Sequence, residues 1–172
     1  MTFIIRHEES GDICDICAIE ALTAAAFLAE EHSSHTEQFI VNALRHAGAL
    51  TLSLVAEQDG ILIGHAALSP VTVSDGTEGW YGLAPVSVLP THQNQGIGSQ
   101  LIRQLLAELQ ESDGAGCVVL GNPGYYGRFG FRTQTGLTLP GIPAEYFQVL
   151  PFGGGRLPQG TVAFHPAFDA TE

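Results

Sequence analysis

Lysine is absent from the sequence, and all six basic residues are arginine. Without lysine, no side chain can form a Schiff base, supply the lysine of a nucleotide-binding phosphate loop or serve as a lysine acetylation site. The 18 acidic residues leave a formal net charge of −12. This charge disfavours nucleic acids and anionic membrane surfaces, which bind clusters of cationic side chains. A cationic ligand would be attracted, although solubility explains the charge more simply.

Cysteine is scarce as well, with three residues, an odd number. This argues against a disulfide framework and predicts reduced thiols. No apolar run approaches the roughly 20 residues of a membrane-spanning helix, and the N-terminal residues lack the layout of a secretory signal. With 172 residues, of which 45% are hydrophobic, the chain can bury one core. We therefore expect a cytoplasmic protein with a single domain over residues 1–172.

The first part of the sequence predicts a strand and two helices. Residues 2–6 are typical of a short strand. Apolar residues then recur at helical spacing, which predicts a helix that buries Ile13, Ile16, Cys17, Ala21, Ala24 and Phe27 on one face. A second helix is predicted to start at Ser34 or Thr36 and to stop at Gly48.

Three antiparallel strands are predicted next, because the apolar period changes to two. The Asp59-Gly60 pair predicts a tight hairpin turn. The return strand runs from Ile61 to Val73 with an interruption near Ser69-Pro70, and a further turn leads into a strand over residues 80–88. Pro85 lies within that strand and predicts a bulge or interrupted pairing, which would open the sheet.

The strand that ends at Val88 leads into a glycine-rich turn and the start of a helix. Gly96 and Gly98 remove side chains where the backbone must approach a ligand, and the first amides of a helix have no intrahelical partner. These amides and the positive end of the helix dipole favour an anion. The turn is therefore predicted to bind phosphate without lysine. A dinucleotide-binding fingerprint does not fit, since its third glycine is missing and the preceding strands are antiparallel.

The second part of the sequence predicts one clear helix and several weaker elements. The helix after the turn ends near residues 112–114, and its apolar stripe comprises Ile97, Leu101, Ile102, Leu105, Leu106 and Leu109. Residues 117–120 form a short apolar strand, which the Gly-Asn-Pro-Gly sequence at 121–124 ends. Short strands are predicted near residues 136–139 and 160–164, and residues 151–155 are predicted to be a loop.

Three motifs together resemble the GNAT superfamily of N-acetyltransferases. Gln93-x-x-Gly96-x-Gly98 matches the Q/R-x-x-G-x-G/A signature in its usual place between a strand and a helix. Val88-x-Pro90 precedes it, and Tyr126-Gly-Arg-Phe-Gly130-Phe131 follows it as Y-x-x-x-G-F. The resemblance extends from about residue 3 to residue 131. It implies an α/β (α+β) fold with a mixed, mostly antiparallel sheet that is splayed between its fourth and fifth strands and flanked by helices.

The resemblance also implies acetyl-coenzyme A (acetyl-CoA) as the co-substrate, and no metal. The pyrophosphate is expected on the amides from Gln95 to Ser99, within a binding segment formed by Gln93, Asn94, Gln95, Gly96, Ile97, Gly98 and Ser99. The pantetheine arm is expected to pair, like an additional strand, with the backbone of Val86, Ser87 and Val88. The amide near Val86 would polarise the thioester carbonyl.

Tyr126 resembles the family's general acid, which protonates the CoA thiolate as it leaves. A phenol with a pKa of about 10 is protonated at neutral pH and can donate this proton. Tyr125 is the neighbouring alternative, and both tyrosines could instead be packing aromatics. Asn122 occupies the position where a similar bacterial branch carries aspartate; it is expected either to bind the pantetheine amide or to form the turn before Pro123.

No motif identifies the base that deprotonates the amine. The candidates by residue type alone are Glu30, Glu31, His32, His35, His65 and Glu78. Each is explained more simply as a solvated or structural residue. By the resemblance, the segment from Glu30 to Glu37 forms one wall of the acceptor site, where its acidic residues would receive a cationic amine.

A zinc site at Cys14-x-x-Cys17 and His32-x-x-His35 is rejected. The histidines are two residues apart where about three to five are usual, and Cys17 lies on the predicted apolar stripe. We expect a buried thiol at Cys17 and a core residue, not a nucleophile, at Cys117.

The sequence therefore predicts an enzyme that transfers an acetyl group from acetyl-CoA to an amine by direct attack in a ternary complex. The acceptor is expected to be a small molecule or a peptide, and a homodimer is one state that the sequence allows. A non-catalytic acyl-CoA-binding sensor and an acyltransferase for a longer acyl group are the alternatives. Tyr126 argues against the sensor, which would need no acid.

Overall fold

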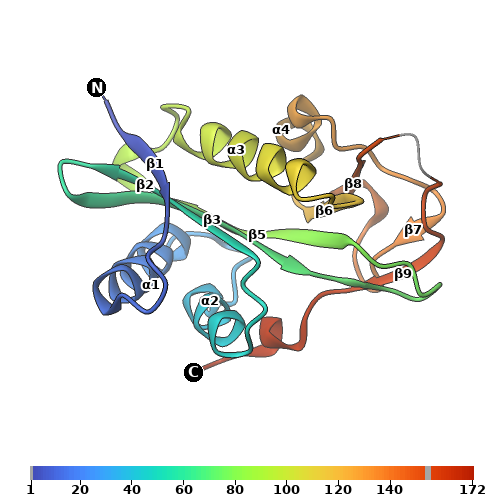
Figure 1. Ribbon diagram of the computed structural model, residues 1–172, viewed down its shortest axis with the longest axis horizontal. Coiled ribbons are helices and arrows are strands. Elements are labelled where there is room, and N and C mark those ends of the chain that lie inside the picture. Colours follow the sequence, from blue (N-terminus) through green and yellow to red (C-terminus); the bar gives the residue numbers. More distant parts are fainter. Residues whose placement is uncertain (1, 154–155) are drawn as a thin grey trace. The chain divides into compact units, whose positions relative to one another are not determined.

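The computed structural model describes residues 2–153 and 156–172 (Figure 1). Their contacts cluster into two compact units, and each unit has its own hydrophobic core. The first unit comprises the chain up to Leu68 together with residues 84–105 and 166–172. The second unit comprises residues 69–83 and 106–165. The chain passes between the units within two strands and one helix, and once more between residues 165 and 166.

The first unit contains helices on a sheet whose strands follow the order β1-β2-β3-β5. Its elements are β1 (Ile4–His7), α1 (Ile13–Phe27), α2 (Glu37–His46), β2 (Leu52–Gln58), most of β3 (Ile61–Pro70), the end of β5 (Trp80–Val88), the 3₁₀ helix η1 (Pro90–His92), the start of α3 (Ile97–Glu111) and the 3₁₀ helix η4 (Pro166–Asp169). β2 pairs antiparallel with both β1 and β3. The predicted turn at Asp59-Gly60 is confirmed, since both residues have positive φ angles, 51° and 78°.

The two faces of this sheet are covered by different helices (Figure 1). Val55 of β2 packs with buried side chains of α1 and α2. On the other face, a Cβ at Gly64 of β3 would lie 2.8 Å from Ile97 and 3.0 Å from Leu101, both on α3. Successive side chains of a strand point to opposite faces, so His65 faces α1 and α2.

The apolar stripe predicted for α3 is confirmed. All six residues are buried: Ile97, Leu101, Ile102, Leu105, Leu106 and Leu109. Helical periodicity succeeds here because polar residues occupy the opposite face and leave one orientation that buries the apolar side chains.

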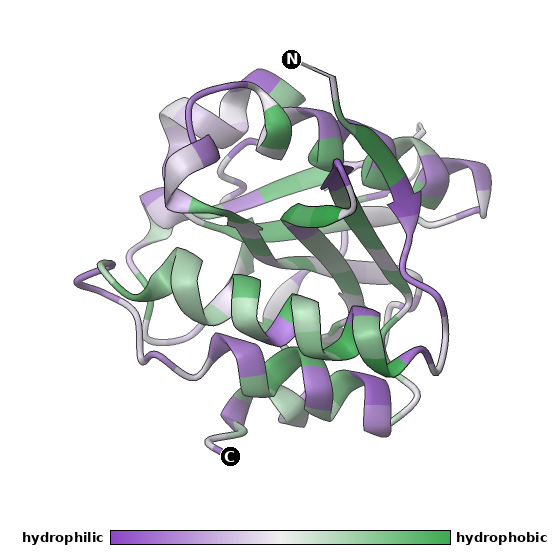
Figure 2. Cartoon of the chain, turned by 90° about the vertical axis from the view of Figure 1, so that its left-hand side faces the viewer, coloured by the Kyte–Doolittle hydropathy of each residue, from purple (hydrophilic) through white to green (hydrophobic). Residues whose placement is uncertain are grey.

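The buried face predicted for α1 is wrong. Ile13 is 71% exposed and Cys17 is exposed, so the expected buried thiol is absent at that position. The face that packs on the sheet instead contains Asp15, Ile19, Leu22 and Thr23. Figure 2 shows the reason, since α1 is mostly green or pale and its apolar residues do not single out one face. The ion pair between Asp15 and Arg6 of β1, at 2.8 Å, orients the helix.

The second unit contains two small strand groups. Its elements are the end of β3, β4 (Thr72–Val73), the start of β5, the end of α3, β6 (Gly116–Leu120), α4 (Pro123–Tyr126), the 3₁₀ helix η2 (Gly127–Phe129), β7 (Leu137–Thr138), the 3₁₀ helix η3 (Ala144–Tyr146), β8 (Phe147–Pro151) and β9 (Gly160–Ala163). The order of the first group is β5-β6-β8 and that of the second is β4-β9-β7. Its core comprises Val71, Val73, Trp80, Val118, Leu137, Phe147, Val149 and Val162.

The later strands test the weaker predictions. β7 and β9 confirm the strands predicted near residues 136–139 and 160–164. β8 was not predicted, and its last residue, Pro151, is the first of the predicted loop. Residues 154 and 155 of that loop lie outside the described residues. β8 exists because it pairs antiparallel with β6, a partner about 30 residues earlier that local sequence does not reveal.

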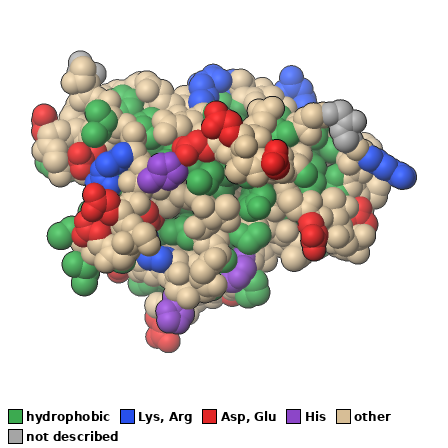
Figure 3. Space-filling model, viewed as in Figure 1, with side chains coloured by type: hydrophobic (Ala, Val, Ile, Leu, Met, Phe, Trp, Pro, Cys, Tyr) green, Lys and Arg blue, Asp and Glu red, His purple; other side chains and the backbone are tan. Residues whose placement is uncertain are grey.

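The ladder between β5 and β6 is short and parallel. It joins Trp80, Tyr81 and Gly82 to residues 116–118, so the rest of β5, including Pro85, lies outside it. This is the mixed sheet with the splay that was predicted. Acidic side chains are scattered over the face shown in Figure 3, in keeping with the net charge. None of the helices in residues 2–153 and 156–172 is long and apolar enough to span a bilayer.

Candidate functional site

The glycine turn lies in the first unit, between η1 and α3. Gly96 has a φ angle of 82°, in the left-handed region that glycine adopts at least strain. The first intrahelical hydrogen bond runs from Gln100 N to Gly96 O at 3.1 Å. The amides of Ile97, Gly98 and Ser99 therefore precede the helical bonds, as the first amides of a helix must. They form a group of donors at the start of α3.

The turn is open to solvent, whereas its helix is anchored in the core. Gln93, Asn94, Gln95 and Gly96 are exposed, Gly98 and Ser99 are half-buried, and Ile97 is buried. No heavy atom lies within 4 Å of the position that a Cβ would take at Gly96. Backbone conformation, rather than lack of space, thus requires glycine there. Asn94 also has a positive φ angle, 63°, which asparagine tolerates better than most residues.

The electrostatics of the turn favour an anion. The first turn of α3 carries no acidic side chain, so no carboxylate neutralises the positive end of the helix dipole. The amides and the dipole attract phosphate without a basic side chain. This agrees with the prediction from the sequence that the turn binds phosphate without a lysine side chain.

A side-chain hydrogen bond connects the turn to the strand that precedes it. The Gln93 side chain donates a hydrogen bond to the carbonyl oxygen of Val88 at 3.2 Å, a contact that the motif did not indicate. Val86 and Val88 are half-buried, and Ser87 between them is 1% exposed. The predicted pantetheine segment and the predicted pyrophosphate segment are thus brought together within the first unit.

Asn122 begins α4 in the second unit. Its Oδ1 accepts a hydrogen bond from the Gly124 amide at 2.8 Å, which is a helix N-cap. The turn-forming role is therefore present, and the side chain is exposed. A role in binding pantetheine stays a prediction.

Tyr126 lies at the end of α4 with its ring packed among aromatic side chains and a glycine. Its ring makes an edge-to-face contact with Phe131, with centroids 6.0 Å apart. A Cβ at Gly121 would lie 2.4 Å from Tyr126 Cε2, so Gly121 makes room for the ring. Burial raises the pKa of Tyr126 to about 12, with smaller contributions from Tyr125 and Cys117. The phenol is therefore protonated at neutral pH.

Tyr125 has different surroundings from its neighbour. The guanidinium of Arg128 lies 4.8 Å from the centroid of its ring, a cation–π contact. Cys117 is buried, as predicted, and burial raises the pKa of its thiol, which disfavours the nucleophilic thiolate.

The candidate bases differ sharply in exposure. Five are exposed: Glu30, Glu31, His32, His35 and Glu78. His65 is fully buried, and its Nε2 lies 2.8 Å from Ser53 Oγ. Burial lowers the pKa of His65 to about 4, while Glu8 raises it and Arg45 lowers it by smaller amounts. No group of three or more potential metal ligands occurs within the described part of the chain.

The fold and the turn define an α/β protein whose helix start favours an anion, and comparison with known proteins identifies the family. Residues 16–131 match the model of the acetyltransferase (GNAT) family. Over 115 residues, 66% of this chain and 69% of the relative, the chain is 41% identical to the Escherichia coli K12 protein described as "Uncharacterized N-acetyltransferase YhbS". The chain belongs to the GNAT family and is an acetyltransferase.

Two solved structures are similar over nearly the whole chain. A GNAT family acetyltransferase from Brucella melitensis, in complex with acetyl-CoA, is 49% identical with a TM-score of 0.85, and the match covers 98% of this chain and 99% of that one. The E. coli YhbS structure, in complex with CoA, is 35% identical with a TM-score of 0.85, covering 99% and 93%. These similarities support the predicted α/β fold, with its mixed sheet between helices.

Proposed function

We propose that this chain transfers an acetyl group from acetyl-CoA to an amine by direct attack in a ternary complex. The observation that carries the proposal is the start of α3. Gly96 is exposed and has a left-handed backbone conformation, and the amides of the next three residues have no intrahelical partner. No carboxylate in the first turn of the helix competes for these amides. The similar B. melitensis acetyltransferase was solved with acetyl-CoA, which supports this ligand.

The residues present fit the two polar parts of acetyl-CoA. The segment from Gln93 to Ser99 would hold the pyrophosphate on its backbone amides. The backbone of Val86, Ser87 and Val88 lies outside the β5–β6 ladder, which leaves this stretch of strand for the pantetheine arm. Asn122 would donate its side-chain amide to a pantetheine carbonyl.

The chemistry needs a polarised carbonyl and a protonated leaving group. Bound acetyl-CoA supplies an acyl carbon that is activated as a thioester. The amide of Val86 would donate a hydrogen bond to the thioester oxygen. Tyr126 would donate its phenolic proton to the departing sulfur, and its burial keeps that proton in place until it is needed.

The acceptor is proposed to be a cationic amine on a small molecule or peptide. The exposed carboxylates of Glu30 and Glu31 and the formal charge of −12 favour such a substrate. We also propose that residues 1–172 act as one N-acetyltransferase domain, and that the free thiols reflect a reducing, cytoplasmic location.

Calorimetry and a thiol-release assay together test the proposal. Calorimetry should show binding of CoA and acetyl-CoA to the purified protein. Release of CoA thiol should then be followed with a polyamine, an aminosugar and a peptide with a free α-amine. Tight binding without turnover on any amine would refute acetyl transfer and favour a sensor. Faster turnover with a longer acyl-CoA would instead assign a longer acyl group.

A further inference from the structure

Two of the three cysteines lie on the solvent side of α1. Cys14 and Cys17 are exposed free thiols, whereas Cys117 is buried. A buried cysteine acts as a small apolar side chain, and its packing accounts for its presence. An exposed thiol adds nothing to the core, so packing does not account for Cys14 and Cys17.

The spacing of these two cysteines suits a disulfide. They lie three residues apart in α1 (Ile13–Phe27), and Cys14 N donates a hydrogen bond to the N-cap residue Asp12 at 2.8 Å. At this spacing in a helix, two Cα atoms are about 5 Å apart, within the range of about 4.4–6.8 Å that disulfides need. The Cβ atoms start about 5–6 Å apart and must approach by about 1–2 Å. The first turn of a helix has fewer intrahelical hydrogen bonds than the interior, which makes this adjustment easier there.

The opposite side of the first turn is anchored to the sheet. Asp15, which lies between the two cysteines in the sequence, is 6% exposed. Its carboxylate accepts hydrogen bonds from Arg6 Nη1 at 2.8 Å, from Arg6 Nη2 at 2.9 Å and from the Glu9 amide at 2.8 Å. α1 can therefore keep its place beside β1 while the thiol side of the turn changes shape.

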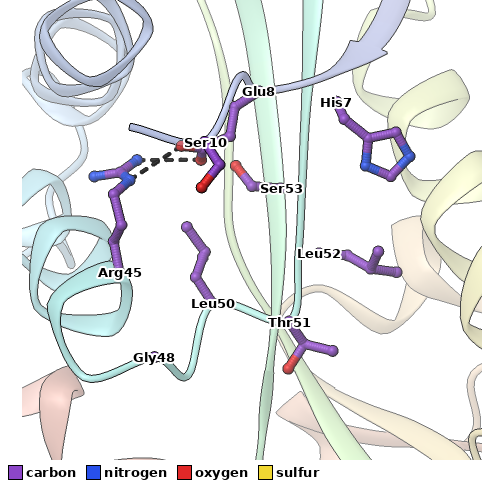
Figure 4. Close-up of a pocket in the computed structure, with 9 residues that line it drawn as sticks. All are labelled: His7, Glu8, Ser10, Arg45, Gly48, Leu50, Thr51, Leu52 and Ser53. Carbon is purple, nitrogen blue, oxygen red and sulfur yellow. Dashed lines mark hydrogen bonds and ion pairs between the residues drawn. The ribbon is translucent and has the colours of Figure 1, made fainter. Parts of the chain in front are cut away.

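The segment that leads into α1 is anchored as well. Arg45 of α2 forms an ion pair with Glu8, with Nε 3.0 Å from Oε2 and Nη2 3.1 Å from Oε1. Both side chains line a pocket of about 330 Å³ in the first unit (Figure 4). The backbone is thus held both before the first turn of α1 and within it.

The surroundings of the two thiols favour disulfide chemistry over metal binding. A structural zinc site needs four ligands, and residues 2–153 and 156–172 contain no group of three or more potential metal ligands. The carboxylate nearest in sequence, Asp15, is already bound by Arg6. An accessible thiol beside a second thiol is the arrangement that reacts reversibly with disulfides.

We propose that Cys14 and Cys17 form a reversible dithiol–disulfide pair that reacts with low-molecular-weight disulfides. The thiolate of one cysteine attacks a sulfur of the small disulfide, whose S–S bond breaks and releases one small thiol. The second cysteine then attacks the cysteine sulfur of this mixed disulfide and releases the other small thiol. The two cysteines are oxidised, the small disulfide is reduced, and the two cysteine protons pass through water to the released thiols. The pair thereby protects two exposed thiols from irreversible oxidation.

Glutathione disulfide is the probe, and the intact mass of the protein is the measurement. Wild-type protein should lose two hydrogen atoms and retain no glutathione, and dithiothreitol should restore the original mass. In Cys14→Ser and in Cys17→Ser the second step cannot occur, so each variant should retain one glutathione group. Both positions are exposed, so these substitutions leave the core unchanged.

A matched control combines Cys17→Ser with Ala21→Cys. Position 21 is exposed on α1, seven residues from Cys14. The two Cα atoms are then about 10 Å apart, beyond the limit of about 7 Å for a disulfide. This variant should retain two glutathione groups. The proposal would be overturned if the wild-type protein also retained two groups, did not react, or formed a disulfide between two molecules.

Peptide mapping locates the bond. The chain lacks lysine, so trypsin cuts only after arginine, and both Cys14 and Cys17 fall within the peptide of residues 7–45. After oxidation this peptide should lack two hydrogen atoms and resist alkylation until it is reduced. The peptide of residues 104–128, which contains Cys117, should be alkylated once the protein is unfolded. A disulfide that joined these two peptides would contradict the pair.

Discussion

Replacing Gly96 by alanine isolates the backbone geometry of the glycine turn. A methyl group at this position meets no heavy atom within 4 Å, so steric overlap does not contribute. An L-residue in the left-handed region costs about 1–2 kcal/mol, and the stiffer unfolded chain offsets about 0.4–1 kcal/mol of this. The free energy of unfolding should therefore fall by about 1 kcal/mol, which lowers Tm by about 2–4 °C in a chain of this size.

The effect on CoA affinity should be larger than the effect on stability. If Gly96 relaxes from its φ angle of 82°, the amides of Ile97 and Gly98 turn away from the phosphate position. One lost hydrogen bond to a charged group is worth about 1.5–3 kcal/mol. Since about 1.4 kcal/mol corresponds to a tenfold change, the Kd for CoA should rise at least tenfold. Calorimetry with CoA measures this directly, alongside thermal unfolding.

Gly60→Ala is the matched control. Gly60 has a φ angle of 78° and nothing within 4 Å of its Cβ position, but it lies in the β2–β3 hairpin. It should lose a similar amount of stability without any change in the Kd for CoA. If Gly96→Ala bound CoA as well as Gly60→Ala, the amides at the start of α3 would not hold the pyrophosphate.

Three further predictions concern Tyr126 and His65. Tyr126→Phe should lower kcat more than tenfold with an unchanged Kd for CoA, and an unchanged kcat in steady-state assays would remove the phenol from the mechanism. Gly121→Ala should also lower kcat, because its Cβ would lie 2.4 Å from the Tyr126 ring. The control is Gly127→Ala, which should leave kcat unchanged because its Cβ would have only an ordinary contact at 3.8 Å. Equal rates for the two variants would show that the ring position is unimportant. The pKa of His65 is lowered to about 4 in the folded state, compared with about 6.5 in the unfolded chain. The stability that the neutral, buried ring contributes is therefore complete above pH 6.5 and is lost as the pH falls from about 6.5 to about 4. Urea denaturation should show stability declining with a slope of up to about 1.4 kcal/mol per pH unit in that window, and His65→Gln should reduce this slope; an identical slope would contradict the assigned pKa.

Local sequence patterns predicted the cofactor segment and much of the sheet. The turn from Gln93 to Ser99 could be recognised because glycine spacing and a helix start are properties of a few consecutive residues. The stripe of α3 could be recognised because its polar face is distinct. The hydrogen bond from the Gln93 side chain to the carbonyl oxygen of Val88 could not be predicted, since the motif does not say where this side chain points.

Long-range contacts decided the features that sequence reasoning missed. The orientation of α1 depends on the ion pair of Asp15 with Arg6, nine residues earlier and on a different element. β8 depends on pairing with β6. In both cases the local pattern was ambiguous, and the choice came from a partner outside the segment.

The sequence by itself determined that a strand, a glycine turn and a helix would follow one another, and it predicts that the turn binds an anion without lysine. Only the tertiary structure decided which polar residues meet. His65 was one of six candidate bases by type, and its position in the fold buries it beside Ser53. The physical reason is that backbone preferences act over a few residues, whereas burial and side-chain hydrogen bonds join residues that are distant in sequence.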